Sequence, residues 1–243
     1  MSANLSYIVM HPRREEFAVS AMVLQRGQAV PRRAKVRILA DAIEGNHDPC
    51  VLTDPWFYSY CHASHLRRSV MGEGSMLFFL DHSRRVFDTV FVVRRKLRWE
   101  RLQPRRPPLP VPIHLTPEMS SLAWSLHFKW PSRGYHENTS VTFEGNSWGD
   151  GRHSFLPFRD EGPVSEAEVV PASVRNKIKS ALPGKHPLAL TREEAEVLYD
   201  RITRASTMQV VGGIKLLLDS DRQQIGVDPA EGPHRTRSHC GRC

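Results

Sequence analysis

Two apolar runs of strand length, separated by five polar residues, constrain the fold of this chain more than any other feature. Residues 75–80 read Ser-Met-Leu-Phe-Phe-Leu and residues 86–93 read Val-Phe-Asp-Thr-Val-Phe-Val-Val, with Asp-His-Ser-Arg-Arg between them. Apolar runs of this length, rich in β-branched and aromatic residues, are typical of strands. They predict a β-hairpin with one buried face, in which Phe79 and Phe91 point inward and Phe78 tolerates substitution.

Further strands and helices are predicted on both sides of this hairpin. Residues 7–10 and 17–24 are apolar runs of strand length, and residues 210–218 predict a closing strand with a bulge at Gly212-Gly213. Residues 170–181 and 190–205 predict helices, the second with a capping box made by Thr191 and Glu194.

Three segments before residue 125 also suggest helices. Residues 31–45 fit a strand by the alternation of Val36 and Ile38, but Pro31 and Gly45 favour a helix. Asp54-Pro55 predicts a helix that runs toward Arg68, and Thr116 predicts a short helix that ends at Trp124.

The length of 243 residues suits one domain with a core of ordinary size. Five prolines between Gln103 and Pro112 indicate an extended connector within that fold. Apolar residues become scarce after about residue 219. We therefore predict an α+β domain over residues 1–218, with a helical C-terminal part, and a flexible basic tail over residues 219–243 that contains Cys240 and Cys243.

Positive charge is concentrated in the first half of the chain. The net charge is +8, and residues 1–110 hold 18 Lys and Arg against 10 Asp and Glu, whereas residues 111–243 hold 16 of each. Such asymmetry points to a polyanionic partner, DNA or RNA. The alternative is a solubilising face in a chain that has 27 arginines and 7 lysines.

Aromatic residues accompany two of the basic clusters. Rings stack on bases while arginine contacts phosphate, so this combination suits nucleic acid. Core packing is the alternative for at least two rings of the first cluster, which runs from Trp56 to Tyr60 and precedes two arginines. The predicted nucleic-acid-binding residues are Trp56, Tyr58, Arg67, Arg68, Arg94, Arg95, Lys96, Arg98 and Trp99.

Enzyme signatures are missing from the sequence. It contains no Walker A loop, no complete dinucleotide glycine motif, no HExxH and no nucleophile elbow. Asp88 stands inside an apolar strand, either as a structural acceptor or as a metal or catalytic acid. A set of possible zinc ligands has an unusual spacing and is interpreted as scattered residues: His47, Cys50, Cys61, His62 and His65. We predict no catalytic residue, metal or cofactor.

The N-terminal segment has no pattern of an export signal, because His-Pro-Arg-Arg follows the first ten residues. The longest apolar run, residues 76–80, is far shorter than the roughly 20 residues that span a bilayer. We therefore expect a cytoplasmic protein that is not embedded in a membrane and whose four cysteines are reduced.

The middle of the chain resembles the PUA-like superfamily, which includes the ASCH, EVE and YTH domains. Residues 74–79, Gly-Ser-Met-Leu-Phe-Phe, are similar to the family's glycine, polar residue and apolar strand. Residues 87–93 are similar to the following barrel strand, and residues 153–157, His-Ser-Phe-Leu-Pro, to a late strand beside the pocket. Over residues 5–160 the resemblance implies a mixed β-barrel with flanking helices that recognises RNA or modified bases. Some bacterial relatives look associated with nucleotide-modification and restriction systems. The aromatic-cage motif is not legible in this sequence, so no cage residue is carried over.

Three hypotheses follow from these observations. The first is a non-catalytic nucleic-acid-binding domain, with a reader of modified bases as its narrower form. The second is a metal-dependent nuclease that uses Asp88, but Arg94-Arg95-Lys96 stands where an acidic residue and a lysine would be needed. The third is a protein-interaction module whose basic surface meets an acidic protein. We favour the first.

Overall fold

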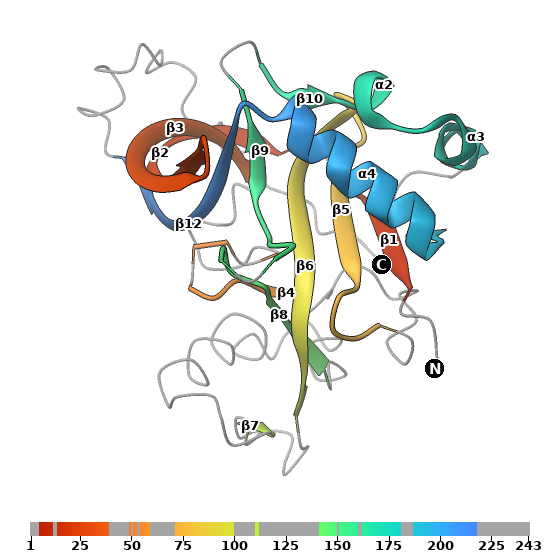
Figure 1. Ribbon diagram of the computed structural model, residues 1–243, viewed down its shortest axis with the longest axis horizontal. Coiled ribbons are helices and arrows are strands. Elements are labelled where there is room, and N and C mark those ends of the chain that lie inside the picture. The colour runs from red at the N-terminus through yellow and green to blue at the C-terminus, as the bar shows by residue number, and fades with distance from the viewer. Residues whose placement is uncertain are drawn as a thin grey trace, which may run out of the picture.

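The computed structural model describes residues 5–11, 14–38, 49, 51–52, 54–58, 71–99, 110–111, 141–149, 151–159, 162–180 and 187–217, without the side chains of residues 97–99, 110–111, 141–142 and 216. The fold is mixed α+β and mostly strand, as predicted (Figure 1). The elements are β1 (Ser6–His11), β2 (Glu15–Gln25), β3 (Gln28–Ile38), β4 (Phe57–Tyr58), β5 (Met76–Asp81), β6 (Val86–Trp99), β7 (Pro110–Val111), β8 (Val141–Gly145), β9 (Leu156–Phe158), β10 (Val164–Ser165), α2 (Glu166–Val169), α3 (Ala172–Ser180), β11 (Leu188–Leu190), α4 (Arg192–Ala205) and β12 (Met208–Leu216).

The long strand β6 runs through the middle of the larger sheet (Figure 1). β5 pairs antiparallel with one of its edges, which confirms the predicted hairpin, and β1 lies parallel beyond β5. The other edge of β6 is shared in turn by β10, by Phe155 and by β8. β7 pairs with the end of β6 on the edge opposite to β8, because Arg98 has a partner in each of these two strands. One strand therefore aligns segments from distant parts of the chain along a single edge.

The smaller sheet has the order β3-β2-β12-β9. The predicted bulge is confirmed in β12, where the register with β2 shifts on both sides of Gly212 and Gly213 adopts a φ of +60°. The outer strands β3 and β9 approach each other, yet no hydrogen-bonded register joins them. The described strands therefore form a curled, open sheet and do not close into a barrel.

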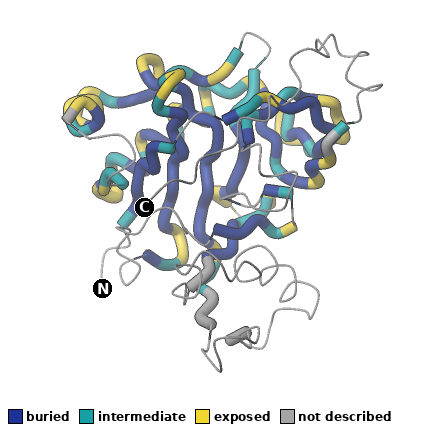
Figure 2. The backbone as a smooth tube through the Cα atoms, turned by 180° about the vertical axis from the view of Figure 1, so that it is seen from behind, coloured by how far each residue is buried: buried dark blue, intermediate teal, exposed yellow. Residues whose placement is uncertain are grey.

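Both faces of the hairpin are buried (Figure 2). Phe79 and Phe91 pack in a core that includes residues of the smaller sheet. Phe78 and Val90 point to the opposite face, into a second core that includes α3 and α4. The expectation that Phe78 tolerates substitution is therefore wrong, because the helices cover the second face of the hairpin as well and leave Phe78 0% exposed.

Both predicted C-terminal helices are confirmed, as α3 and α4. The capping box of α4 forms as expected: the N–H of Glu194 donates to Oγ1 of Thr191 at 3.2 Å, and the N–H of Thr191 donates to Oε2 of Glu194 at 2.9 Å. Within the described part of the chain, no helix is long and apolar enough to cross a membrane.

Two helix predictions are wrong over the residues that the structure describes, and residues 39–45 and 59–68 of these segments lie outside them. Residues 31–38 belong to β3, because burial of Ala34, Val36 and Ile38 on one face outweighs the helix signals of Pro31 and Gly45. Asp54 and Pro55 form a bend, and the next residues enter β4, which pairs with β8. The predicted helix at 116–124 and the tail at 219–243 lie outside the described residues, as does the proline-rich connector apart from residues 110–111 of β7.

Candidate nucleic-acid interface

The predicted basic segment, residues 94–99, forms the last part of β6, beyond the residues that pair with β5. Its first two arginines differ in role. Arg94 occupies a bulge, where the register between β6 and β8 shifts, and its side chain is 52% exposed. Nη2 of Arg95 lies 2.7 Å from Oε2 of Glu144, whose side chain is 1% exposed. Nη1 of Arg94 lies 3.9 Å from Oε1 of the same carboxylate. Arg95 is therefore anchored to a buried acid, whereas Arg94 offers its guanidinium to solvent.

The two aromatic candidates on β4 and just before it are core residues. Trp56 is 4% exposed and Tyr58 is 2% exposed. The ring of Tyr58 packs edge-on against Phe79, with centroids 5.2 Å apart. Neither ring can stack on a base in this structure, so the packing alternative holds for this pair. Arg67, Arg68 and the side chains of Arg98 and Trp99 lie outside the described residues.

A short loop after β8 is fixed onto the same edge of β6. The N–H of Asn146 donates to the carbonyl of Val92 at 2.7 Å, and the N–H of Ser154 donates to the carbonyl of Asn146 at 2.8 Å. Oγ of Ser154 accepts from the N–H of Val92 at 2.9 Å. Gly149 and Gly151 adopt positive φ angles of 111° and 78°, which other residues rarely tolerate. The loop is therefore closed on itself and tied to β6.

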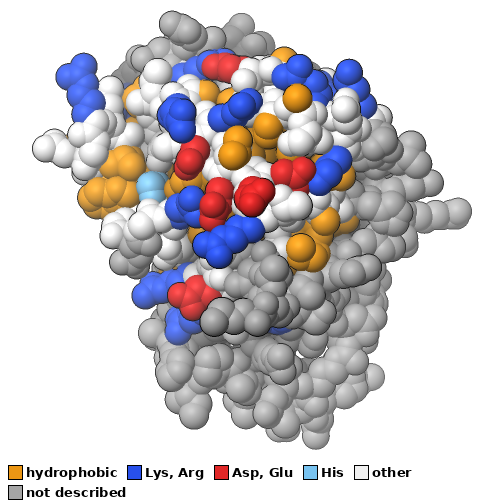
Figure 3. All heavy atoms as spheres, turned by 45° about the vertical axis from the view of Figure 1, so that its right-hand side comes forward, with side chains coloured by type: hydrophobic (Ala, Val, Ile, Leu, Met, Phe, Trp, Pro, Cys, Tyr) orange, Lys and Arg blue, Asp and Glu red, His pale blue; other side chains and the backbone are white. Residues whose placement is uncertain are grey.

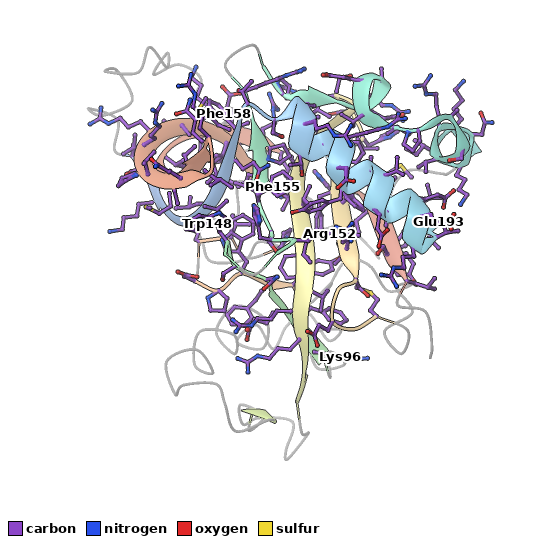
Figure 4. The ribbon with its side chains drawn as sticks, viewed as in Figure 1. Lys96, Trp148, Arg152, Phe155, Phe158 and Glu193 are labelled. Carbon is purple, nitrogen blue, oxygen red and sulfur yellow. The ribbon has the colours of Figure 1, made fainter. Side chains whose placement is uncertain are left out.

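This loop carries the most exposed large apolar side chain of the described residues, Trp148, at 44% exposure. A hollow of about 460 Å³ beside the loop is lined by residues that include Arg94, Asn146 and Arg152. Nη1 of Arg152 lies 3.2 Å from Oε1 of Glu196 on α4, and its side chain remains 43% exposed. Figure 4 labels Trp148 on the side of β6 that bears the smaller sheet, Arg152 on the side that bears α4, and Lys96 toward the lower end of β6. We call this set of Arg94, Asn146, Trp148 and Arg152 the β6 loop site.

The chemistry of the β6 loop site suits a single nucleic-acid strand. An exposed indole can stack on a base of any sequence, and guanidinium groups beside it can bind phosphates. The sequence prediction missed Trp148 and Arg152. The available signal is the stretch around Trp148, which is rich in Gly and Asn and is typical of a surface loop.

Asp88 is accommodated by a second bulge in β6. The register with β5 changes between Phe79 and Leu80, which leaves Asp88 as the extra residue. Oδ1 of Asp88 accepts from Oγ1 of Thr89 at 2.9 Å and lies 3.4 Å from Nη1 of Arg14. Oδ2 of Asp88 lies 2.7 Å from Nε2 of His11, although the two atoms are not aligned as a hydrogen bond.

This arrangement favours the structural role for Asp88. The other ring nitrogen of His11, Nδ1, accepts from Nε of Arg14 at 3.3 Å, so both nitrogens face protein groups. No group of three or more metal-ligating side chains occurs among the described residues. The five residues of the possible zinc set lie outside the described part of the chain, as do Cys240 and Cys243.

Comparison with protein-family models gives no match for this sequence. Searches of curated proteins and of solved structures find no significant similarity either. The residues of the chain itself therefore carry the functional proposal.

Proposed function

We propose that this protein is an intracellular nucleic-acid-binding domain that holds a single strand of DNA or RNA at the β6 loop site. One observation carries the proposal, the segregation of charge between elements. β3 and the end of β6, residues 94–99, carry only basic charges: Arg32, Arg33, Lys35, Arg37, Arg94, Arg95, Lys96 and Arg98. Helix α4 instead carries three basic and four acidic residues. On the side of the molecule that bears α4, blue and red side chains are intermingled (Figure 3). A polyanion would therefore favour β3 and the end of β6 over α4.

The exposed indole of Trp148 supports a single strand over a duplex. A ring on a fixed loop offers a stacking surface to an unpaired base, which a duplex does not present. Arg94 and Arg152 line the hollow beside the same loop, together with one acidic residue, Glu73, and they would bind the phosphates of the strand. Recognition of a modified base is the narrower form of this proposal, and a PUA-like barrel is its structural counterpart. The curl of the smaller sheet is consistent with such a barrel left open between β3 and β9.

The proposal is tested by fluorescence anisotropy with labelled single-stranded DNA, single-stranded RNA and duplex DNA over a range of salt concentrations. We expect the logarithm of the binding constant to fall linearly with the logarithm of the salt concentration. We expect Trp148→Ala to weaken single-strand binding by about 1–3 kcal/mol. Arg201→Ser on α4 is the matched control for Arg94→Ser, because it removes the same charge from an exposed position on the charge-balanced face.

Two outcomes would replace this proposal. If none of the three nucleic acids binds in a salt-dependent way, the hypothesis of a protein-interaction module replaces this proposal. Cleavage that requires Mg²⁺ or Mn²⁺ and disappears in Asp88→Asn would establish the nuclease. A parallel screen of modified and unmodified oligonucleotides separates a reader of modified bases from a general binder.

A further inference from the structure

A cavity of about 440 Å³ lies where the curled smaller sheet fails to close. One wall is β3, the other is β9 with the residues that follow it, and Phe87 and Asp88 of β6 also line it. This volume falls within the range of small-molecule sites. We call this cavity the β3–β9 gap.

β3 gives the gap its charge. Arg33, Lys35 and Arg37 alternate along the strand, so their side chains share the face opposite to the one that enters the core. All three line the gap, together with Arg159. Arg159 already bonds within its own segment, because Nε donates to the carbonyl of Gly162 at 3.1 Å. The strand thus directs a row of cations toward the cavity.

Arg37 has an unused donor in this row. Its side chain is only 10% exposed, and its Nη2 lies 3.5 Å from Oε2 of Glu16. Its Nη1 is buried and has no hydrogen-bond partner among the described residues. Burial lowers the pKa of Arg37 and the guanidinium of Arg84 lowers it further, whereas Glu16 acts in the opposite direction. Folded proteins seldom leave a buried donor without an acceptor. Arg37 therefore lines the gap with one donor that lacks an acceptor among the described residues, and an anion must displace neighbouring atoms to reach Nη1.

The charges of the lining define the ligand. The residues that line the gap include four with basic and two with acidic side chains, Glu16 and Asp88, so positive charge is in excess. The side chain of Asp88 is itself 0% exposed, and Nη1 of Arg159 already lies 3.0 Å from Oε2 of Glu168. A phosphate monoester carries about −1.5 to −2 at neutral pH and matches the fork of an arginine. Phe87, Pro157 and Phe158 add apolar and aromatic surface beside the cations. We infer that the β3–β9 gap binds a nucleotide phosphate monoester, either a free mononucleotide or the terminal phosphate of a strand, with the phosphate at Arg37.

The test uses the full chain and isothermal titration with adenosine 5′-monophosphate, adenosine and inorganic phosphate. The key variant is Arg37→Gln. The control is Arg32→Gln, which removes the same charge from the same strand at a residue that does not line the gap. If Arg37→Gln does not fold, Lys35→Gln replaces it, because Lys35 lines the gap and its side chain is 38% exposed.

We expect saturable binding of the monophosphate, weakened about tenfold or more by Arg37→Gln and less than about twofold by Arg32→Gln. Adenosine binding as tightly as its monophosphate would overturn the inference, as would the lack of saturable monophosphate binding to folded protein at millimolar concentration. Equal weakening by both variants would overturn it too.

Oligonucleotides with and without a 5′ phosphate distinguish the two sources of the ligand. Tighter binding of the phosphorylated strand, lost in Arg37→Gln, assigns the gap to a strand terminus. Monophosphate binding without that difference assigns it to a free nucleotide. These measurements do not depend on Arg94 or Trp148, so the inference and the proposed single-strand function can fail separately.

Discussion

Nε2 of His11, at the end of β1, lies 2.7 Å from Oδ2 of Asp88 in β6, although β5 separates the two strands in the sheet. The bulge at Asp88 explains how they meet. Strict alternation along β6 would direct Asp88 to the face of Val90 and Val92, which pack in the apolar core beneath the helices. The extra residue turns Asp88 to the opposite face, where Thr89 also lies and Arg14 is within 3.4 Å of its carboxylate.

Asp88→Asn should lower the free energy of unfolding by about 3–5 kcal/mol, because it removes the acidic partner of a buried cation. The side chain of Arg14 is 2% exposed and that of Asp88 is 0% exposed, so water cannot replace the lost charge. Urea denaturation of the wild type and the variant at neutral pH measures the difference.

The double variant Arg14→Met with Asp88→Asn separates the charge from the packing. We expect it to be less destabilised than the sum of the single variants, because neither charge is then left alone. A loss below about 0.5 kcal/mol for Asp88→Asn would contradict the structural role.

Asp81, at the end of β5, should make stability depend on pH in the acid range. Burial alone would raise the pKa of Asp81, but hydrogen bonds from the Ser83 hydroxyl and from the N–H groups of Arg84 and Arg14, together with the charge of His11, hold that pKa below its ordinary value. The folded-state pKa is depressed, so the contribution is complete above the unfolded pKa of about 3.9 and is lost as pH falls through the folded pKa.

Denaturant titrations of the wild type and Asp81→Asn from neutral pH to about pH 3 check the sign. The stability gap between them should be widest at neutral pH and should narrow on acidification. A gap that stays constant or widens as the pH falls would show that ionised Asp81 does not stabilise the fold.

The sequence correctly predicts those strands and helices whose signals come from residues close together in the chain. The hairpin of β5 and β6 has uninterrupted apolar runs, and α4 begins at a capping box that needs only Thr191 and Glu194. β3 was misassigned because its strand character depends on a partner: Arg33 to Ile38 alternate basic and apolar residues, and pairing with β2 along the whole strand decides the outcome.

The candidate site was less predictable than the fold. The basic character of residues 94–96 is visible in the sequence, but the difference between Arg94 and Arg95 depends on a bulge and on Glu144, which is 49 residues away from Arg95. Trp56 and Trp148 are equally aromatic in the sequence. Only the tertiary structure buries the first and exposes the second.

Phe78→Ala and Phe79→Ala should each cost about 3–5 kcal/mol of stability, although their side chains lie on opposite faces of β5. Both rings are at most 1% exposed, each in a different core. Val197→Ala on α4 is the control, and since Val197 is 42% exposed it should change stability by less than about 0.5 kcal/mol. Chemical denaturation of the three variants tests this, and a tolerant Phe78 would mean that the helices do not cover that face.

Arg94→Ser and Arg95→Ser should separate binding from stability. Among the described residues, Arg95→Ser leaves the Glu144 carboxylate, 1% exposed, with only the 3.9 Å contact to Arg94. We therefore expect a loss of about 1–3 kcal/mol in unfolding free energy. Arg94→Ser should change stability by less than about 0.5 kcal/mol, because its guanidinium is half exposed and its ion pair is long.

Oligonucleotide binding should rank the same two variants in the opposite order. Loss of one phosphate contact at Arg94 should flatten the slope of log affinity against log salt by about 0.7 for a single strand, and the affinity should fall alike for all sequences.

Adding Glu144→Gln to Arg95→Ser should recover part of the lost stability, because the buried charge is removed with its partner. Denaturation and salt-dependent anisotropy on one set of proteins measure both quantities. The opposite result would be a stable Arg95→Ser variant with a flattened salt slope and an Arg94→Ser variant that binds like the wild type. It would show that Arg95, and not Arg94 at the bulge, contacts the phosphate.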